Sequence, residues 1–288
     1  MWPWVIEQPF RIGSYGLMMA TGFLTAWALL ARELRRRGLP SDLATATIFL
    51  AATTGLIGSK LAYLLTEAPS FAWSDLWSGS GLTWHGGLIL ATLVLVAFYR
   101  LRQLPIGVMA DAVAPMLASG YGFGRLGCQL AGDGDYGVPC APGTWHDLVC
   151  MAYPRGIVPS PCESGGVRHE ICPIDVPDPT WLQVHPTPVY EALGAFALAG
   201  LLWAMRTRVR RPGLLFAAYL VVAGLSRFAV EFLRLAEGRP DRWLGLRDAQ
   251  WVGLAMAVLG VGIAAVVTAR RAAPPRPAGP AARGAGAP

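Results

Sequence analysis

The sequence has little charge. Only 15% of its 288 residues are Asp, Glu, Lys or Arg, whereas 54% are hydrophobic. A soluble domain of this size cannot bury so much apolar surface, so much of that surface should face lipid. The 24 basic residues exceed the 18 acidic ones. They fall in short clusters between long uncharged runs, a pattern that indicates membrane topology and no nucleic-acid partner.

Three further absences narrow the class of protein. The N-terminus lacks a basic stretch and a small-residue cleavage site, so we expect no removed signal peptide and interpret Trp2 and Trp4 as interfacial anchors. No internal repeat stands out, which argues against a transporter built from two inverted halves. No C-x-x-C pair occurs, and this spacing argues against a zinc site, so we predict no metal.

Seven long apolar runs are what the sequence does contain. A spanning helix needs about 20 mostly apolar residues. The runs lie at 12–31, 43–65, 78–99, 105–127, 186–205, 212–233 and 249–269. We therefore predict an all-α, polytopic membrane protein with about seven transmembrane helices. The tail at 270–288 is rich in Ala, Pro, Gly and Arg, a composition typical of disorder.

The arginines predict an orientation, because short cytoplasmic loops are enriched in basic residues. Most of them follow the first, third, fifth and seventh runs. They are Arg32, Arg35, Arg36, Arg37, Arg100, Arg102, Arg206, Arg208, Arg210, Arg211, Arg270 and Arg271. The loop after the sixth run departs from this trend with Arg234, Arg239, Arg242 and Arg247. We predict that the N-terminus lies outside and that the tail is cytoplasmic.

Four cysteines fall in the long outer segment that follows the fourth run. They are Cys140, Cys150, Cys162 and Cys172. Oxidising conditions on that side would let such an even set form disulfides, and three pairings are possible. We expect the segment 128–185 to form a small stapled cap rather than an independently folding domain. It separates a first helical part, 1–127, from a second, 186–269.

Charged residues inside the apolar runs are candidates for function, because a charge at bilayer depth is costly. They are Lys60, Asp111, Arg125, Glu191, Arg227 and Glu231. The predicted topology gathers five of them towards the outer leaflet. Asp111 is the exception, and we interpret it as a helix-start or interfacial carboxylate. Arg227 and Glu231 share a helix face at a spacing of four, where they could line a site or only lock two helices together.

Three motifs place polar groups near the outer ends of the runs. Arg125 lies in YGFGRLG, where glycines allow close approach of a ligand and the guanidinium fork suits a phosphate. His85 opens WHGGLIL, where imidazole could accept a proton from a thiol or could serve only as a hydrogen-bonding residue. His185 heads HPTPVYEAL, which brings Tyr190 to the same level, and its more ordinary role is to cap and orient the fifth helix.

The ordered motifs resemble the prolipoprotein diacylglyceryl transferase family. They are SYGLMMATGF at 14–23, HGGLI at 85–89, GRLG at 124–127, HPTPVYE at 185–191 and RFAVEFLR at 227–234. The resemblance implies a multi-pass enzyme of the bacterial cytoplasmic (inner) membrane. Such an enzyme moves the diacylglyceryl group of phosphatidylglycerol onto the lipobox cysteine thiol in the signal-peptide region of a preprolipoprotein, forming a thioether and releasing glycerol phosphate without a cofactor.

The resemblance also implies roles for individual residues. Arg125 and Arg227 would hold the lipid phosphate and neutralise the charge that grows on it as it departs, and His85 would assist deprotonation of the thiol. The remaining predicted substrate-binding residues are Tyr15, Glu231, Arg234, His185 and Tyr190.

Departures from the usual family pattern lie close to the proposed chemistry. Leu90 follows HGGLI where a glycine is usual. Cys128, Ala131 and the acidic GDGDYG at 132–137, which includes Asp133, stand where the signature continues with two asparagines and a glutamate. We interpret the Cys128 thiol as structural. Two alternatives stay open. A divergent transferase with another acceptor or lipid would keep both arginines and His85, whereas a non-enzymatic lipid-binding or transport protein would bind without turnover.

Overall fold

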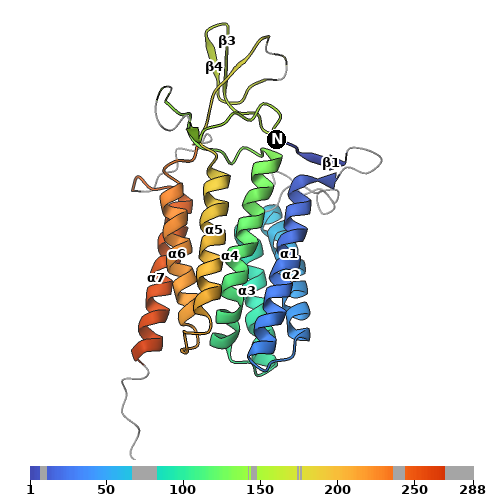
Figure 1. Ribbon diagram of the computed structural model, residues 1–288, viewed down its shortest axis with the longest axis vertical. Coiled ribbons are helices and arrows are strands. Elements are labelled where there is room, and N and C mark those ends of the chain that lie inside the picture. The colour runs from blue at the N-terminus through green and yellow to red at the C-terminus, as the bar shows by residue number, and fades with distance from the viewer. Residues whose placement is uncertain are drawn as a thin grey trace, which may run out of the picture.

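The computed structural model describes residues 1–6, 12–66, 83–141, 143, 148–173, 175, 177–235 and 244–269. Within this part of the chain, seven helices form an elongated bundle (Figure 1). They are α1 (Ser14–Arg36), α2 (Asp42–Thr66), α3 (Trp84–Leu101), α4 (Ile106–Ala131), α5 (Thr187–Met205), α6 (Leu214–Val230) and α7 (Asp248–Ala269). Each helix coincides with one of the predicted apolar runs, so the prediction of a mostly helical protein is confirmed.

Five of these helices are long and apolar enough to cross a membrane, namely α1, α2, α4, α5 and α7. The other two candidates, residues 85–101 and 214–230, are apolar but shorter. The number of spans and the orientation therefore remain predictions. The predicted disordered tail at 270–288 and residues 67–82 of the loop between α2 and α3, with the start of the predicted run 78–99, lie outside the described residues.

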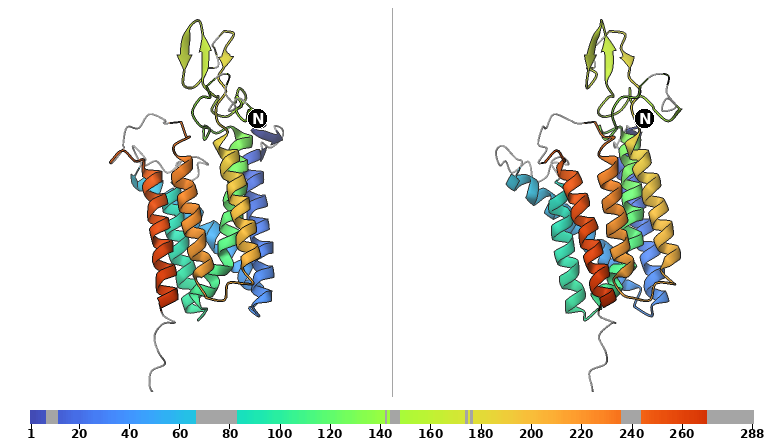
Figure 2. Two further views of the ribbon diagram at one scale, coloured as in Figure 1. Left: turned by 60° about the vertical axis from the view of Figure 1, so that its left-hand side comes forward. Right: turned by 90° about the vertical axis from the view of Figure 1, so that its left-hand side faces the viewer.

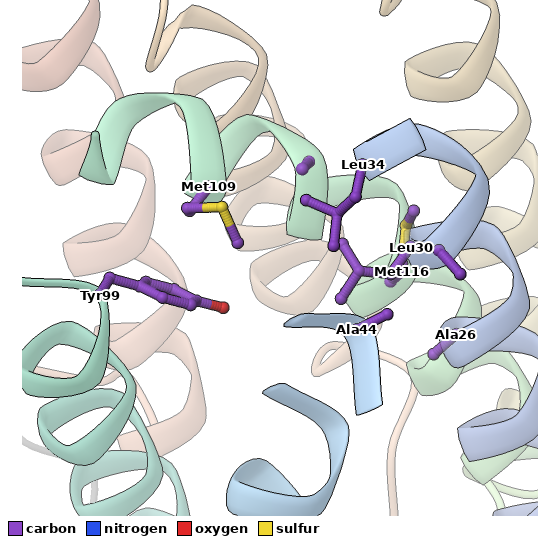
Figure 3. Packing of buried hydrophobic residues seen from close by; sticks show 9 residues of the cluster. Ala26, Leu30, Leu34, Ala44, Tyr99, Met109 and Met116 are labelled. Atoms are coloured by element: carbon purple, nitrogen blue, oxygen red, sulfur yellow. The ribbon is translucent and has the colours of Figure 1, made fainter. Parts of the chain in front are cut away.

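The bundle is held by specific helix pairs. α1 packs mainly on α4, α4 also on α5, α6 on α7, and α2 on α3. A core of buried apolar side chains joins α1 to α4 near the end where α1 and α3 finish and α2 and α4 begin (Figure 3). Leu30 and Leu34 of α1 meet Ala44, Tyr99 and Met109 there. The Tyr99 hydroxyl, 3.1 Å from Thr47 Oγ1, has the hydrogen-bond partner that a buried tyrosine requires.

Glycines let two of these pairs approach closely. A Cβ atom on Gly224 of α6 would lie 2.9 Å from the backbone nitrogen of Ala257 on α7, and one on Gly58 of α2 would lie 2.5 Å from the carbonyl oxygen of Gly86 on α3. Such contacts leave no room for a side chain, and small residues are the usual means by which membrane helices pack backbone to backbone.

Asp111 fastens α4 to the start of α6. Its carboxylate accepts hydrogen bonds from the backbone nitrogens of Gly213 at 2.8 Å and Phe216 at 2.9 Å. The first backbone N–H groups of a helix have no partner within it, so a buried carboxylate there both satisfies donors and favours the helix dipole. The expected helix-start carboxylate is thus a cap, but for α6 rather than for its own helix.

A second buried carboxylate ties together the same end of the bundle. Glu33 of α1 is 2% exposed and pairs with Arg36 at 2.6 Å, Arg37 at 2.6 Å and Arg206 at 3.3 Å. Arg206 follows α5, so this cluster joins two helices that are distant in sequence. One carboxylate shared by three guanidiniums is stable here because Arg36 and Arg206 remain partly exposed.

A cap covers the opposite end of the bundle. It comprises residues 132–186 and stands on that end in all views (Figure 2). Its outer part is an antiparallel sheet in the order β4-β3-β5, built from β3 (Cys162–Ser164), β4 (Val167–His169) and β5 (Thr180–Trp181). Cys140 is bonded to Cys150 and Cys162 to Cys172. Of the three possible pairings, the structure therefore has the one that joins successive cysteines.

A short N-terminal hairpin lies beside the cap. β1 (Trp4–Ile6) pairs antiparallel with β2 (Ile12–Gly13), and the backbone nitrogen of Ser14 donates to the carbonyl of Pro3 at 2.9 Å. Trp2 and Trp4 are both exposed there. Neither strand was expected from the sequence, because elements of two or three residues carry no periodic signal.

Backbone hydrogen bonds connect the base of the cap to the ends of α4, α5 and α6. α4 extends four residues beyond the predicted boundary at 127 and stops at Gly132, whose φ of +62° suits glycine. The backbone nitrogen of Gly137 then donates to the carbonyl of His185 at 2.7 Å, and that of Val138 to Leu233 at 2.8 Å. These bonds hold the segment that follows α4 between the start of α5 and the end of α6.

Candidate active site

An alternating series of charged side chains crosses the bundle at the end that the cap covers. Its members, called here the ion-pair chain, come from α4, the base of the cap, α5, the end of α6 and the segment before α7. They are the arginines Arg125, Arg227, Arg234 and Arg247 and the carboxylates Asp135, Glu191 and Glu231. Each carboxylate lies between two arginines.

Glu191 is the centre of the ion-pair chain. Its Oε2 lies 3.3 Å from Nε of Arg125 and its Oε1 lies 3.8 Å from Nη1 of Arg227. Tyr121, one helical turn before Arg125, donates its hydroxyl to Glu191 and accepts a hydrogen bond of 3.0 Å from Nε of Arg125. Three helices therefore fix the two arginines relative to each other.

Asp135 connects this centre to the cap. Its two carboxylate oxygens accept hydrogen bonds from Arg125 and Arg234. Burial by itself would raise the pKa of Asp135, but the two guanidiniums outweigh it and hold that pKa below its ordinary value. The hydroxyl of Thr187, the first residue of α5, donates to the carbonyl of Asp135 at 2.5 Å and so fixes the turn in which the carboxylate lies.

Glu231 completes the series at the far end. It lies in the turn that follows α6, where its Oε2 is 2.9 Å from Nη1 of Arg227 and its Oε1 is 3.3 Å from Nη1 of Arg247. The same nitrogen of Arg247 donates to the carbonyl oxygens of Glu231 and Arg234, both at 3.2 Å. The predicted Arg227–Glu231 pair is thus present as one link of a longer chain, which joins α6 to α5 through Glu191 and to the segment before α7 through Arg247.

The ion-pair chain has a positive charge in excess. Four guanidiniums face three carboxylates, and the exposed fractions of the arginine side chains are only 13% to 23%. Buried atoms of Arg227 (Nη1), Glu191 (Oε2) and Glu231 (Oε2) also lack a hydrogen bond of good geometry among the described residues. Electrostatic attraction is stronger in such a poorly hydrated place than in water, so a phosphate that reaches these guanidiniums would be bound strongly. The carboxylate of Asp133, within 4.8 Å of that of Asp135, balances the fourth positive charge.

The thiol of Cys128 lies next to the ion-pair chain. Its sulfur and one carboxylate oxygen each of Asp133 and Asp135 all lie within 4.8 Å of one another. Two guanidiniums already neutralise Asp135, which makes the place unfavourable for a metal cation. The other such group contains Cys140, Cys150 and His185, but these two cysteines are bonded to each other and offer no thiolate.

Tyr15 lies beside α4 in the first turn of α1. A Cβ atom on Gly127 would lie 2.9 Å from the Tyr15 ring, so the glycine of GRLG makes room for the tyrosine. Its side chain is partly exposed. The hydroxyl is near enough to Cys128, Asp133 and Arg125 for their charges to act on it, and this places Tyr15 at the edge of the candidate site.

His185 and Tyr190 lie where the cap meets α5. Nδ1 of His185 is 3.3 Å from the Tyr190 hydroxyl and 3.8 Å from Sγ of Cys150. The N-cap residue of α5 is Pro186, which makes no side-chain hydrogen bond. His185 therefore does not cap the helix as we expected but contacts the cap disulfide, and the ion-pair chain includes neither residue.

His85 belongs to another part of the bundle. It lies in the first turn of α3, with an exposed side chain, and α3 packs mainly on α2. The ion-pair chain is built by α4 to α7 and the cap, so the structure places His85 at the same end but not among the paired charges. Lys60 of α2 is buried, with its ammonium 5.7 Å from the centroid of the Tyr63 ring.

The sequence analysis missed three members of the site. Tyr121 carried a usable signal, because it precedes Arg125 by one helical turn. Asp135 was included only in the departure GDGDYG, and Arg247 only in the loop that breaks the arginine trend. Glu191 was noted as a charge inside a run but received no role. Asp135, Arg247 and Glu191 enter the site through contacts between segments that are distant in sequence, and no local sequence pattern predicts such contacts.

Comparisons with known proteins relate nearly the whole chain to one family. The model of the family described as prolipoprotein diacylglyceryl transferase matches residues 3–266. A relative from Geobacter sulfurreducens is 32% identical over 286 residues, which cover 92% of this chain and 96% of the relative. One from Rhodospirillum rubrum is 32% identical over 283 residues, or 92% and 91% of the two chains. Both are named phosphatidylglycerol–prolipoprotein diacylglyceryl transferase.

Proposed function

This chain belongs to the prolipoprotein diacylglyceryl transferase family, and from that we propose that it transfers the diacylglyceryl group of phosphatidylglycerol to the lipobox cysteine of a preprolipoprotein. The transfer forms a thioether and releases glycerol phosphate. The structural observation that carries the proposal is the cluster of four largely buried guanidiniums at the cap end of the bundle. Such donors suit the singly charged phosphodiester of phosphatidylglycerol.

Arg125 and Arg227 are the residues best suited to hold the phosphate. They come from different helices, and Glu191 lies between them. A phosphate oxygen bound by one nitrogen of each arginine would therefore meet two guanidiniums in a fixed orientation. Guanidinium forks match the oxygens of a phosphate group. Nη1 of Arg227 is buried between Glu191 and Glu231 without a hydrogen bond of good geometry, so a phosphate oxygen could compete for it.

The chemistry is a displacement at carbon. The cysteine sulfur, as a thiolate, attacks the glyceryl carbon that bears the phosphate, the C–O bond breaks, and its electron pair stays on the leaving phosphate oxygen. The leaving group thereby gains negative charge, which the arginines stabilise more than they stabilise the bound lipid. The thiol proton passes to a base, and we assign that role to His85, whose first-turn position on α3 leaves its side chain exposed.

We propose that the cap end of the bundle faces outward from the bacterial inner membrane, with the C-terminal tail in the cytoplasm. Two features support this orientation. Arginines concentrate at the opposite end of the helices, as in cytoplasmic loops, and the cap contains two disulfides, which form outside the cytoplasm. A secreted preprolipoprotein would then present its cysteine to the site from the membrane plane.

The test is mass spectrometry of a lipobox peptide incubated with phosphatidylglycerol and the purified protein. We expect the mass of a diacylglyceryl group to be added. Arg125→Ala and Arg227→Ala should each lower the transfer rate by about 10²- to 10³-fold, the usual effect of removing one donor to developing charge. The matched control is Arg208→Ala, an exposed arginine at the other end of the bundle, which should transfer at the wild-type rate.

Other outcomes separate the alternatives. If the peptide stays unmodified under conditions where another family member modifies it, while phosphatidylglycerol is consumed, the acceptor is a different thiol. If lipid is bound and neither substrate is consumed, the protein binds lipid without turnover. Equal rates for wild type and Arg125→Ala would remove the ion-pair chain from the mechanism.

A further inference from the structure

A polar cavity lies at the end of the bundle opposite the cap. Its volume is about 270 Å³, and it lies between the last turns of α1 and the start of α2. α1 contributes Trp27, Ala28, Ala31, Arg32 and Arg35 to its walls. These positions follow the spacing of three and four that defines one helix face, and the two alanines leave the space that larger side chains would fill.

The arginines of this cavity differ from their neighbours on α1. Arg36, on the adjacent face, forms an ion pair with the buried Glu33, whereas neither Arg32 nor Arg35 forms an ion pair within the described part of the chain. Asp42, in the first turn of α2, also lines the cavity. One carboxylate facing two guanidiniums leaves a net positive charge, so the cavity favours an anion.

Hydroxyl groups and an indole complete the polar walls. Ser41 and Thr45 line the cavity from the side of α2. The indole nitrogen of Trp27 donates to the Thr45 hydroxyl at 3.0 Å, which fixes the two helices relative to each other. Two guanidiniums and neighbouring hydroxyls are the donors that a phosphate oxygen requires.

The depth of the cavity matches a lipid headgroup. α1 has 23 residues, so at a rise of 1.5 Å it is about 34 Å long, slightly more than the roughly 30 Å hydrocarbon core of a bilayer. Its last turn therefore reaches the headgroup level. One turn deeper, on the same two helix faces, the apolar side chains of Leu24 and Phe49 are 66% and 64% exposed, and they offer a surface for acyl chains.

We propose that this cavity binds the anionic phosphate headgroup of a phospholipid from the leaflet opposite the cap. The phosphate would lie against Arg32 and Arg35, and the acyl chains along Leu24 and Phe49. A free phosphate ion offers the same oxygens, but it would make no use of the exposed Leu24 and Phe49 beside the cavity. This site is separate from the ion-pair chain and does not depend on the transfer reaction.

The test is native mass spectrometry of the full-length protein titrated with dioleoylphosphatidylglycerol in detergent. Removing both charges in Arg32→Gln/Arg35→Gln should weaken the binding of one lipid by at least about tenfold, because the phosphate loses charge-assisted hydrogen bonds from two guanidiniums. The matched control, Arg208→Gln/Arg210→Gln, removes two exposed arginines at the same end of the bundle and should bind as wild type does. Dioleoylphosphatidylcholine should bind at least tenfold more weakly to the wild-type protein.

A second variant tests the cavity while keeping its charge. Ala28→Leu should fill part of the cavity and weaken the binding of dioleoylphosphatidylglycerol. The melting temperature should not change, because the side chain of residue 28 is exposed. An equal loss of lipid affinity in the two double variants would mean that only general surface charge attracts lipid, and this would overturn the proposal. The proposal would also be overturned if Ala28→Leu bound the lipid as tightly as the wild-type protein does. Competition by inorganic phosphate as effective as that by the lipid would assign the cavity to a free anion instead.

Discussion

At the scale of single residues, Asp135 connects the ion-pair chain to the cap. It is the one link between Arg125 and Arg234 in the described structure. Asp135→Asn preserves the shape but leaves both guanidiniums without that negative partner, which should lower the free energy of unfolding by about 1–3 kcal/mol. The measurement is thermal or denaturant unfolding in detergent. Asp133→Asn is the matched control, because Asp133 lies two residues away and forms no ion pair in the described residues.

The effect of Asp135 should depend on pH. Its pKa in the folded protein is below its ordinary value of 3.8. A carboxylate of this kind contributes stability that is fully present above its unfolded pKa and is lost as the pH falls through the folded value. The gap in stability between wild type and Asp135→Asn should therefore be constant from pH 6 to 8 and close only below about pH 4. A gap that closes near neutral pH would contradict the assignment of its pKa.

The sequence could predict some of the site at this scale but not all of it. The Arg227–Glu231 pair follows from a helical spacing of four, and Arg125 from a charge flanked by glycines inside an apolar run. Asp135 and Arg234 are 99 residues apart in sequence, and they meet only because the chain after α4 hydrogen-bonds to the end of α6. Pairing of that kind depends on the folded cap, about which the sequence of GDGDYG says nothing.

At the scale of helices, the contact between α6 and α7 depends on the absence of side chains. Gly224→Val should force the two helices apart, because even its Cβ atom would lie 2.9 Å from the nitrogen of Ala257 and 3.1 Å from Cβ of Met256. We expect a loss of about 1–3 kcal/mol in the free energy of unfolding. The control is Gly262→Val on α7, where a Cβ atom would meet nothing within 4 Å. Equal losses in both variants would show that helix propensity, not packing, is responsible.

Helices were the most predictable elements and the cap strands the least. Apolar runs of about twenty residues indicate spanning helices irrespective of their partners, and each described helix lies within a few residues of its predicted run. The predicted ends of the helices were less accurate. α6 stops at Val230 rather than at 233, which places Glu231 in a turn where it can reach both Arg227 and Arg247. Strands of two or three residues form only because the two disulfides and the helix ends hold the cap together.

At the scale of the whole molecule, the two disulfides of the cap can be compared directly. Both close a sequence separation of 10, so their effects on the entropy of the unfolded chain should be alike, about 3 kcal/mol or less each. Their surroundings differ. The backbone of Cys140 bonds to Gln183 at 2.9 Å and Cys150 lies against His185, next to the segment that holds Asp135, whereas Cys162–Cys172 staples the outer sheet.

Replacing each pair by serine should therefore separate stability from activity. We expect Cys162→Ser/Cys172→Ser to lower the melting temperature but to keep the rate of lipid transfer per folded molecule. Cys140→Ser/Cys150→Ser should lower both, because it loosens the base of the cap. The measurements are unfolding curves and initial rates of transfer to the lipobox peptide. Identical rates in the two variants would mean that the position of Asp135 is independent of the cap.

The pairing of the helices has a consequence for biosynthesis. α2 and α3 are translated one after the other and can associate at once, whereas α1 must wait in the membrane until α4, its main partner, has been made. Arg247 leaves the ribosome later still, just before α7. Until then Glu231 has one arginine partner instead of two, and the glycine face of α6 has no helix against it. Assembly of the ion-pair chain must therefore wait for the segment before α7 to be synthesised.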